Sequence, residues 1–405
     1  MNEADSRLTS PWLLPEGITE ILPSQARRLE FIRRKVLDMY ETWGYQLVIT
    51  PMLEYLESLQ IGTGQDLDLQ TFKLIDTLSG RLLGVRADIT PQAARIDARQ
   101  TGQDAPVRLC YLGTVLRAYQ DAIGGTRAPL QLGAELYGHA GIESDIEIID
   151  LMLETFRIVG VEKFVLDLGH VAIFRGLVEE AGLDPQQEQQ LFDALQRKAI
   201  PEINQLLNQW SIPNRVHTML SSLANLNGGQ ETLSQARGLL SAAPSDVIQA
   251  LDQLGRVAKK IRDNRPEVEV HFDLSELRGY QYQTGIVFAA FIPGYGQEVA
   301  RGGRYDNIGE TFGRSRPATG FSADLKVMLD YSEDGTRPSA KKPIFAPYVE
   351  DESLQDMILA LRNMGEQVIS ELPGQAGDAE SMGCDRILVK FEDEWDIKQL
   401  KKNKR

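Results

Sequence analysis

The sequence contains few of the residues on which metal sites and disulfides depend. Its two cysteines, Cys110 and Cys384, lie far apart in 405 residues, and its four histidines are scattered. This spacing matches no zinc motif, so we expect no metal site and two reduced thiols in a cytoplasmic protein. No apolar run reaches the roughly 18 residues of a membrane span. The acidic N-terminal residues precede no hydrophobic segment, which argues against a secretory signal.

Positive charge is also scarce, with 43 basic against 58 acidic residues and a net charge of −15. A nucleic-acid-binding protein usually has a basic surface, because neutralising phosphates supplies much of its affinity. The basic cluster at 398–405 is the kind of sequence found at a solvated chain end. The common phosphate-loop, dinucleotide, serine-nucleophile and zinc-protease motifs are absent. We therefore expect no nucleic-acid partner, no membrane contact, no cofactor and no catalytic residues.

Hydrophobic periodicity predicts a mixed α+β chain with an antiparallel sheet flanked by helices. A long helix with one apolar face covers 23–43, and a Leu/Gln/Ala-rich stretch near 177–265 indicates a helical insertion. A polar linker at 332–342 then separates a core domain, 1–335, from a small α/β domain, 343–405. The other predicted helices are 90–99, 145–159, 321–331 and 354–364, and the predicted strands include 45–49, 71–74, 82–86, 108–116, 130–137, 268–274, 284–291, 298–301 and 387–391.

The segment Leu130–Leu136 places polar groups on one face of a predicted strand. Because side chains alternate along a strand, Gln131 and Glu135 point the same way, with Gly133 between them. A glycine between two polar residues leaves a gap lined by acceptors, which suits an ammonium or imidazole donor. The alternative is an ordinary solvated strand face.

A second polar group, Arg86, Asp88 and Thr90, shares a face where a strand leads into a helix. The structural alternatives are good here: Thr90 followed by Pro91 is a favourable start for a helix, and Arg86 and Asp88 can form an ion pair. The residue types alone do not choose between a binding site and these local roles.

A third segment predicts that Arg278, Tyr280 and Tyr282 lie together on a strand next to a glycine. An arginine beside phenols suits a carboxylate ligand, although structural roles are equally consistent with these residues. The stretch 302–306, Gly-Gly-Arg-Tyr-Asp, could hold an anion or form a tight turn before a helix.

Taken in order, these segments resemble the core of a class II aminoacyl-tRNA synthetase of the histidyl type over residues 11–331. The helix ending at Gly44 with the following strand resembles motif 1, which is the dimer element of that family, and residues 111–138 resemble motif 2. The other matching segments are 15–23, 278–288, 302–306 and 320–321. Several motifs in the same order are more specific than any one of them.

The resemblance implies a histidine-binding pocket. Asp88 stands where the family has an acid for the α-amino group, with Thr90 beside it, and Gln131 and Glu135 match motif 2 residues that contact the α-amino group and the imidazole. Arg278 matches the arginine near the carboxylate, and Tyr282 matches the first pocket tyrosine. Gln283 replaces the second tyrosine, and its amide can still hydrogen-bond to a ring nitrogen. Arg117 is the arginine that motif 2 retains.

The resemblance fails in the half of the site that would bind ATP. Val327 stands at the arginine position of motif 3, Asp324 replaces a glycine, and Tyr119 replaces the usual acid of motif 2. ATP is a polyanion whose desolvation must be offset by cations. We therefore expect that the adenylation reaction is lost.

The segments 169–175 and 382–389 resemble a non-catalytic branch of this family, the regulatory subunits of ATP phosphoribosyltransferase. That resemblance implies a partner, the short-form catalytic subunit, in a hetero-octamer that carries out the first step of histidine biosynthesis under feedback control by L-histidine. It also implies a homodimer through the motif 1 element. The alternatives are a stand-alone histidine-binding module and an active histidyl-tRNA synthetase.

Overall fold

The computed structural model describes residues 12–60, 65–102, 104–120, 125–277, 279–280, 282–332 and 341–400. The chain forms two compact units, Met1–Thr336 and Arg337–Arg405. Within the described ranges, no helix is long and apolar enough to cross a membrane.

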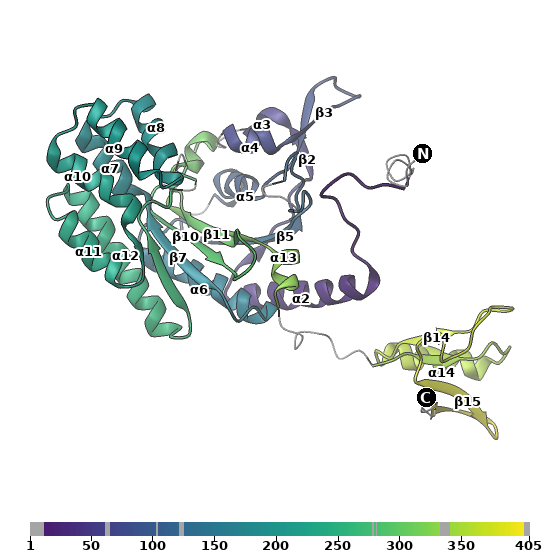
Figure 1. Cartoon of the computed structure of the whole chain (residues 1–405). Helices are drawn as coiled ribbons and strands as arrows, with labels where there is room; N and C mark the ends of the chain where they lie inside the picture. Colours follow the sequence, from purple (N-terminus) through teal and green to yellow (C-terminus); the bar gives the residue numbers. More distant parts are fainter. Residues whose placement is uncertain are drawn as a thin grey trace, which may run out of the picture. The chain divides into compact units, whose positions relative to one another are not determined.

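The first unit is built on a nine-stranded sheet in the order β1-β5-β6-β12-β11-β10-β7-β9-β8 (Figure 1). Its neighbouring strands are antiparallel except for the pairs β1–β5 and β7–β9. The strands are β1 (Gln46–Leu47), β5 (Val107–Thr114), β6 (Leu130–Tyr137), β7 (Val165–His170), β8 (Asn227–Gly228), β9 (Glu269–Asp273), β10 (Ile286–Phe291), β11 (Glu298–Arg304) and β12 (Ala318–Asp324).

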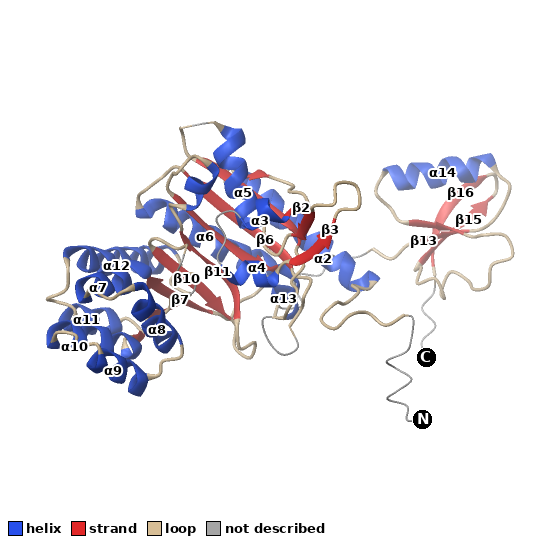
Figure 2. Cartoon of the chain, turned by 90° about the horizontal axis from the view of Figure 1, so that it is seen from above, coloured by secondary structure: helices blue, strands red, loops and turns tan. Residues whose placement is uncertain are grey.

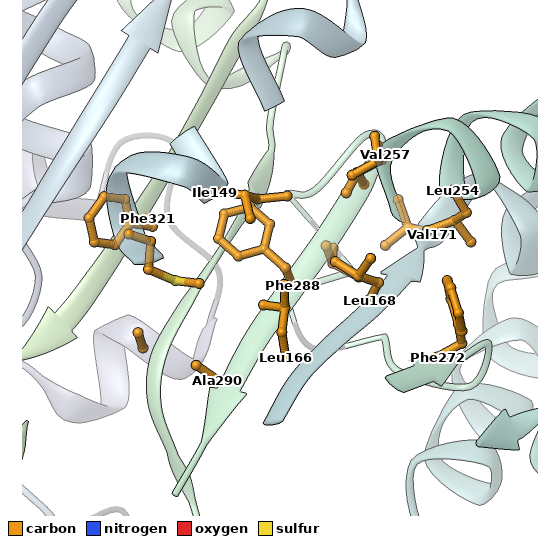
Figure 3. Packing of buried hydrophobic residues seen from close by; sticks show 14 of the residues in the cluster. Ile149, Leu166, Leu168, Val171, Leu254, Val257, Phe272, Phe288, Ala290 and Phe321 are labelled. Atoms are coloured by element: carbon orange, nitrogen blue, oxygen red, sulfur yellow. The ribbon is translucent and has the colours of Figure 1, made fainter. Parts of the chain in front are cut away.

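One face of this sheet packs against helices α2 (Pro23–Thr42), α6 (Ile142–Val159) and α13 (Leu325–Asp330). In α2, Ile32, Val36 and Tyr40 recur every four residues and are fully buried, so the predicted apolar face is confirmed. Figure 3 shows how side chains of the sheet, among them Leu166 and Phe288, interlock with helical residues in one core. Burying this face fixes the register of the strands, since a shift by one residue would turn the polar face inward.

The other face of the sheet carries a smaller layer (Figures 1 and 2). This layer contains a three-stranded sheet, β2-β4-β3, and short helices, and it stands over the polar side chains of β5 and β6. Its elements are β2 (Leu53–Tyr55), α3 (Leu56–Gln60), α4 (Gln65–Gln70), β3 (Phe72–Ile75), β4 (Leu82–Val85), α5 (Thr90–Ile96), the π-helical turn η1 (Asp97–Thr101) and the 3-10 turn η3 (Ile308–Phe312).

A group of helices lies beyond the β7 and β9 end of the sheet (Figures 1 and 2). Their apolar faces join the main core through α12, whose seven buried residues recur at helical spacing. The members are α7 (Val171–Ala181), α8 (Pro185–Gln196), α9 (Ile200–Gln209), α10 (Asn214–Ser222), the 3-10 turn η2 (Leu223–Asn225), α11 (Glu231–Leu239) and α12 (Ser245–Asn264).

Two predicted elements differ from the structure near the ligand-facing side of the sheet. The predicted helix 321–331 begins only at Leu325, because residues 318–324 form strand β12, which pairs with both β6 and β11. The predicted strand 45–49 is reduced to the two residues of β1, which form parallel pairs with β5. In both places pairing with neighbouring strands, which the local sequence does not encode, decided the outcome.

The second unit is a four-stranded sheet in the order β14-β13-β15-β16, with one helix packed against it. Leu354, Ile358 and Leu361 of that helix are buried against Ile344 and Leu388 of the sheet. The prediction missed the last strand, which includes Lys398 at the start of the basic cluster; residues 401–405 of that cluster lie outside the described residues. The elements are β13 (Ile344–Ala346), α14 (Glu352–Asn363), β14 (Val368–Ser370), β15 (Arg386–Phe391) and β16 (Glu394–Gln399).

Candidate amino-acid-binding site

Glycines on neighbouring strands form the floor of the candidate site. Gly320 on β12 is paired with Glu135 on β6 and with Gly303 on β11, so all three residues face the same side of the sheet. A Cβ added to Gly320 would lie 1.5 Å from Oε2 of Glu135, and one added to Gly303 would lie 2.6 Å from Oε1 of Gln283. The missing side chains therefore leave the space in which the Glu135 carboxylate and the Gln283 amide lie side by side.

Glu135 is buried, with 1 % of its surface exposed, so the alternative of a solvated strand face is wrong. Its Oε1 accepts a hydrogen bond from the Tyr111 hydroxyl at 2.9 Å, and its Oε2 accepts one from the Tyr305 hydroxyl. Burial raises the pKa of Glu135 to about 8, against the opposing effect of the two phenols. The carboxyl group therefore titrates close to neutral pH.

Asp88 lies on the same network, and Gln131 orients it. Gln131 Nε2 donates to Asp88 Oδ1 at 2.7 Å, and Gln131 Oε1 accepts from the backbone N–H of Ile89 at 2.9 Å. Asp88 Oδ1 also accepts from the backbone N–H of Thr90 at 2.9 Å. Both contacts use one oxygen of Asp88, and no hydrogen bond within the described ranges uses the second oxygen.

Thr90 and Arg86 do not have the local roles that the sequence suggested as alternatives. Thr90 is not the cap of α5, since it lies within the helix and its hydroxyl is 3.0 Å from that of Tyr111. Arg86 forms no pair with Asp88 among the contacts of the described residues. Its guanidinium instead donates to the carbonyls of Thr50 and Thr114 at 2.7 and 3.0 Å, which ties the strands together beneath the site.

The segment that follows Leu277 is a turn, not the predicted strand. Backbone N–H groups of Tyr282 and Gln283 both donate to the carbonyl of Gly279. Tyr280 and Tyr282 therefore separate: Tyr280 is buried against α7 and α8, whereas the Tyr282 ring lies 6.4 Å from the ring of Tyr305. Arg278, the predicted carboxylate ligand, lies outside the described residues.

Gln283 reaches the site from this turn. The side chain is 4 % exposed, and its Oε1 has no hydrogen-bond partner within the part of the chain that the structure describes. A buried acceptor without a partner is unfavourable by roughly 1–3 kcal/mol. A ligand N–H placed over Gly303 would satisfy it.

The stretch 302–306 holds no anion, because its arginine is fully occupied inside the protein. Arg304 forms a buried ion pair with Asp145 at 3.0 Å and also binds Asp306 and the carbonyls of His139 and Gly141. Gly302 to Arg304 belong to strand β11 rather than to a tight turn. Because this network holds Arg304, it also positions the next residue, Tyr305, whose hydroxyl donates to Glu135.

Tyr111 and Tyr305 are site residues that the sequence argument missed. Tyr111 could have been found from alternation, because it is paired with Gly133 and its hydroxyl fills the gap above that glycine. Tyr305 was visible within the quoted 302–306 stretch. Its distance of 170 positions from Glu135 gives no local signal of their contact.

A cavity of about 430 Å³ adjoins the site at Gln131. It is the part of the pocket where the family resemblance would place ATP, and it is lined by Arg117, Arg301, Glu298 and Asp324 among others. Glu298 pairs with Arg301 at 3.4 Å, and Asp324 accepts from the backbone N–H of Lys326 at the start of α13. The two acids offset the two arginines, so the cavity has no excess of positive charge for a triphosphate.

The other two departures from the synthetase pattern also provide no phosphate contact. Val327 packs against the hydrophobic core of the first unit, and Tyr119 is 68 % exposed. The expected loss of adenylation therefore has a structural basis at each of the positions named from the sequence.

Comparison with known proteins places this fold in the class II aminoacyl-tRNA synthetase-like group. The histidyl-tRNA synthetase family model matches residues 17–328. A solved structure from Bacillus halodurans, described as an ATP phosphoribosyltransferase regulatory subunit/histidyl-tRNA synthetase, aligns with a TM-score of 0.81 and 26% identity, covering 92% of this chain and 96% of that one. The predicted α+β fold of the class II type is confirmed.

The second unit and the full-length relatives narrow the class to one family. Residues 341–398 match the C-terminal domain of ATP phosphoribosyltransferase subunit HisZ. ATP phosphoribosyltransferase regulatory subunits of Thioalkalivibrio sulfidiphilus and Pseudomonas syringae are 56% and 50% identical, each covering 96% of this chain and 98% of its relative. The chain belongs to the family of ATP phosphoribosyltransferase regulatory subunits, and it is a non-catalytic member of the synthetase-like class.

Proposed function

We propose that the chain binds free L-histidine over the glycine floor and passes the state of that site to a short-form ATP phosphoribosyltransferase catalytic subunit. The observation that carries the proposal is the buried Glu135 carboxyl group, held by two phenols, with Asp88 on the same network. These groups form an acceptor-rich cluster whose chemistry matches a ligand with an ammonium group and an imidazole ring.

The acceptors divide between the two donor groups of histidine. Asp88, positioned by Gln131 and with one oxygen available, suits the α-ammonium group. The side-chain oxygens of Glu135 and Gln283 lie over the neighbouring glycines Gly320 and Gly303, so they suit the N–H groups of the imidazole ring. We assign Arg278 to the carboxylate, Tyr282 to the open side of the ring, and Thr90 and Arg117 to the margins of the site.

Feedback control requires that histidine favours one state of the assembly over another, because a ligand shifts an equilibrium only by its difference in affinity for the two states. The coupling is reciprocal, so the catalytic subunit's substrates would change histidine affinity by the same factor, typically about 5–150-fold. We propose a hetero-octamer as the assembled form.

We also propose that the chain forms a homodimer through the motif 1 element. Strand β1 is the edge of the nine-stranded sheet, and Leu47 and Ile49 beside it are 47 % and 89 % exposed. An exposed apolar edge is a surface that proteins normally cover. A second copy related by a two-fold axis would cover both edges at once.

The test measures histidine binding by isothermal titration calorimetry and then phosphoribosyl transfer by the reconstituted pair. The wild-type chain should bind histidine, and Asp88→Asn should weaken binding at least tenfold, whereas Glu310→Gln, an exposed acid outside the site, should not. Added histidine should inhibit transfer by the complex. Absence of histidine binding would refute the site assignment, and binding without any effect on transfer would favour a stand-alone histidine-binding module.

A separate assay addresses the synthetase alternative. Histidine-dependent exchange of pyrophosphate into ATP should be at background with the purified chain. Exchange above that level would contradict the expected loss of the adenylation reaction.

A further inference from the structure

The turn that carries Tyr282 and Gln283 is held in place by the helical segment. Arg175, on the partly buried side of α7, donates from Nη2 to the carbonyl of Tyr280 at 3.2 Å and to the carbonyl of Gln283 at 3.1 Å. One guanidinium nitrogen thus binds the backbone carbonyls of both Tyr280 and Gln283, which fixes the backbone of Gln283 relative to α7.

Tyr280 provides a second attachment between the turn and the helices. It is 8 % exposed, and its ring centroid lies 5.2 Å from that of Phe174 on α7 and 5.6 Å from that of Phe192 on α8. Its hydroxyl donates to Glu188 on α8 at 2.6 Å. The Arg175 guanidinium lies over the same ring, 5.0 Å from its centroid.

These contacts connect the turn to helices α7 and α8. Arg175, Tyr280, Glu188 and Phe192 line a cavity of about 330 Å³ between α7, α8 and the turn. On the other side of the turn, Gln283 places its amide over Gly303, within the site. A shift of α7 or α8 would therefore move the backbone carbonyl and the side chain of Gln283 together.

We infer that Arg175 is a positioning residue for the histidine site, with Tyr280 as its partner. It sets the position of Gln283 and Tyr282 without contacting the ligand, and it links the site to the helices α7 and α8. This inference rests on the proposed histidine-binding function.

Arginine suits this role better than lysine. Its planar group binds two carbonyls while stacking on a ring, whereas an ammonium group is a point charge with no face to stack. Arg175→Lys should retain part of the function because the charge over Tyr280 and one carbonyl contact can remain. Arg175→Gln should lose the clamp.

The test compares histidine affinity, thermal stability and amide hydrogen exchange of residues 279–284 in the full-length chain. We expect Arg175→Gln to weaken histidine binding by about tenfold or more and Arg175→Lys by about threefold. Histidine should protect amides 279–284 from exchange in the wild type and much less in Arg175→Gln. The matched control is Arg197→Gln, an arginine of the same helical segment whose guanidinium pairs on the surface with Glu202.

The possible failures are distinguishable. A wild-type chain that binds no histidine would overturn the proposed function itself. A wild type that binds, with Arg175→Gln folded and equal in affinity and exchange protection, would overturn only the role of Arg175. If Arg175→Gln does not fold, the inference is tested with Arg175→Lys alone. Wild-type histidine affinity and wild-type exchange protection in Arg175→Lys would overturn the inference. A histidine affinity about threefold weaker than that of the wild type would support it.

Discussion

Replacing Glu135 with glutamine should change stability and ligand binding in opposite directions. In the unfolded chain a glutamate loses its proton near its ordinary pKa of 4.5, whereas in the folded protein burial raises the pKa of Glu135 to about 8. Between these values the folded state holds the additional proton. The free energy of unfolding of the wild type therefore falls as the pH rises through this window, and the loss is complete above pH 8.

The difference between the two pKa values, from 4.5 to about 8, corresponds to roughly 5 kcal/mol, because each pH unit is worth about 1.4 kcal/mol. Glutamine has no proton to lose, so Glu135→Gln avoids that loss. It also weakens one of the hydrogen bonds from Tyr111 and Tyr305, at a cost of about 1 kcal/mol. We expect the variant to be slightly less stable than the wild type near pH 5 and about 4 kcal/mol more stable above pH 8.

Urea unfolding near pH 5, 7 and 8.5 measures this crossover, with Glu310→Gln as the exposed control that should follow the wild type. Histidine titration above pH 8, where Glu135 carries its charge, measures the functional effect, because the loss of a charged acceptor should weaken binding by about 10- to 100-fold. A stability difference that is the same at every pH would refute the assignment of a raised pKa to Glu135. Unchanged histidine affinity would refute its place in the site.

Three further predictions follow from the packing. Gly320→Ala places a Cβ 1.5 Å from the Glu135 carboxylate and should weaken histidine binding at least tenfold. Gly238→Ala, where a Cβ meets open space, should leave histidine binding unchanged. A histidine affinity of Gly320→Ala equal to that of the wild type would contradict the glycine floor. Arg304→Gln leaves a buried carboxylate unpaired and should lower the free energy of unfolding by about 3–5 kcal/mol, and a loss under 1 kcal/mol would contradict the burial argument. Ile49→Asp should convert a dimer into a monomer in sedimentation velocity, whereas Leu359→Asp on α14 should not; a dimer that persists would place the interface elsewhere.

Helix α2 followed from local pattern. The four-residue spacing of its apolar residues is a property of neighbouring positions, which the sequence displays directly. Strand β12 was assigned instead to a helix, because its structure depends on hydrogen bonds to β6 and β11, which lie far away in sequence. The final hairpin strand, β16, was missed for the same reason.

The site shows the same contrast between local pattern, which the sequence displays, and contacts between distant segments, which it does not. Alternation along one strand was enough to place Gln131 and Glu135 on a common face, and the structure confirms this face and buries it. Alternation failed at Tyr280 and Tyr282, since it presupposes a strand and the chain forms a turn there. Local geometry therefore predicted residue types on one element, but not the contacts between elements.

By itself the sequence indicated the class of fold and the chemistry that the protein has lost. The order of the motifs indicated a class II fold, and Asp324 and Val327 indicated the loss of the ATP half without any coordinates. Only the tertiary structure decided that Glu135 is buried between Tyr111 and Tyr305, because burial and a raised pKa arise from groups that meet across the sheet. A sequence lists the titratable groups, whereas the folded chain sets the dielectric environment and the partners that fix their charge.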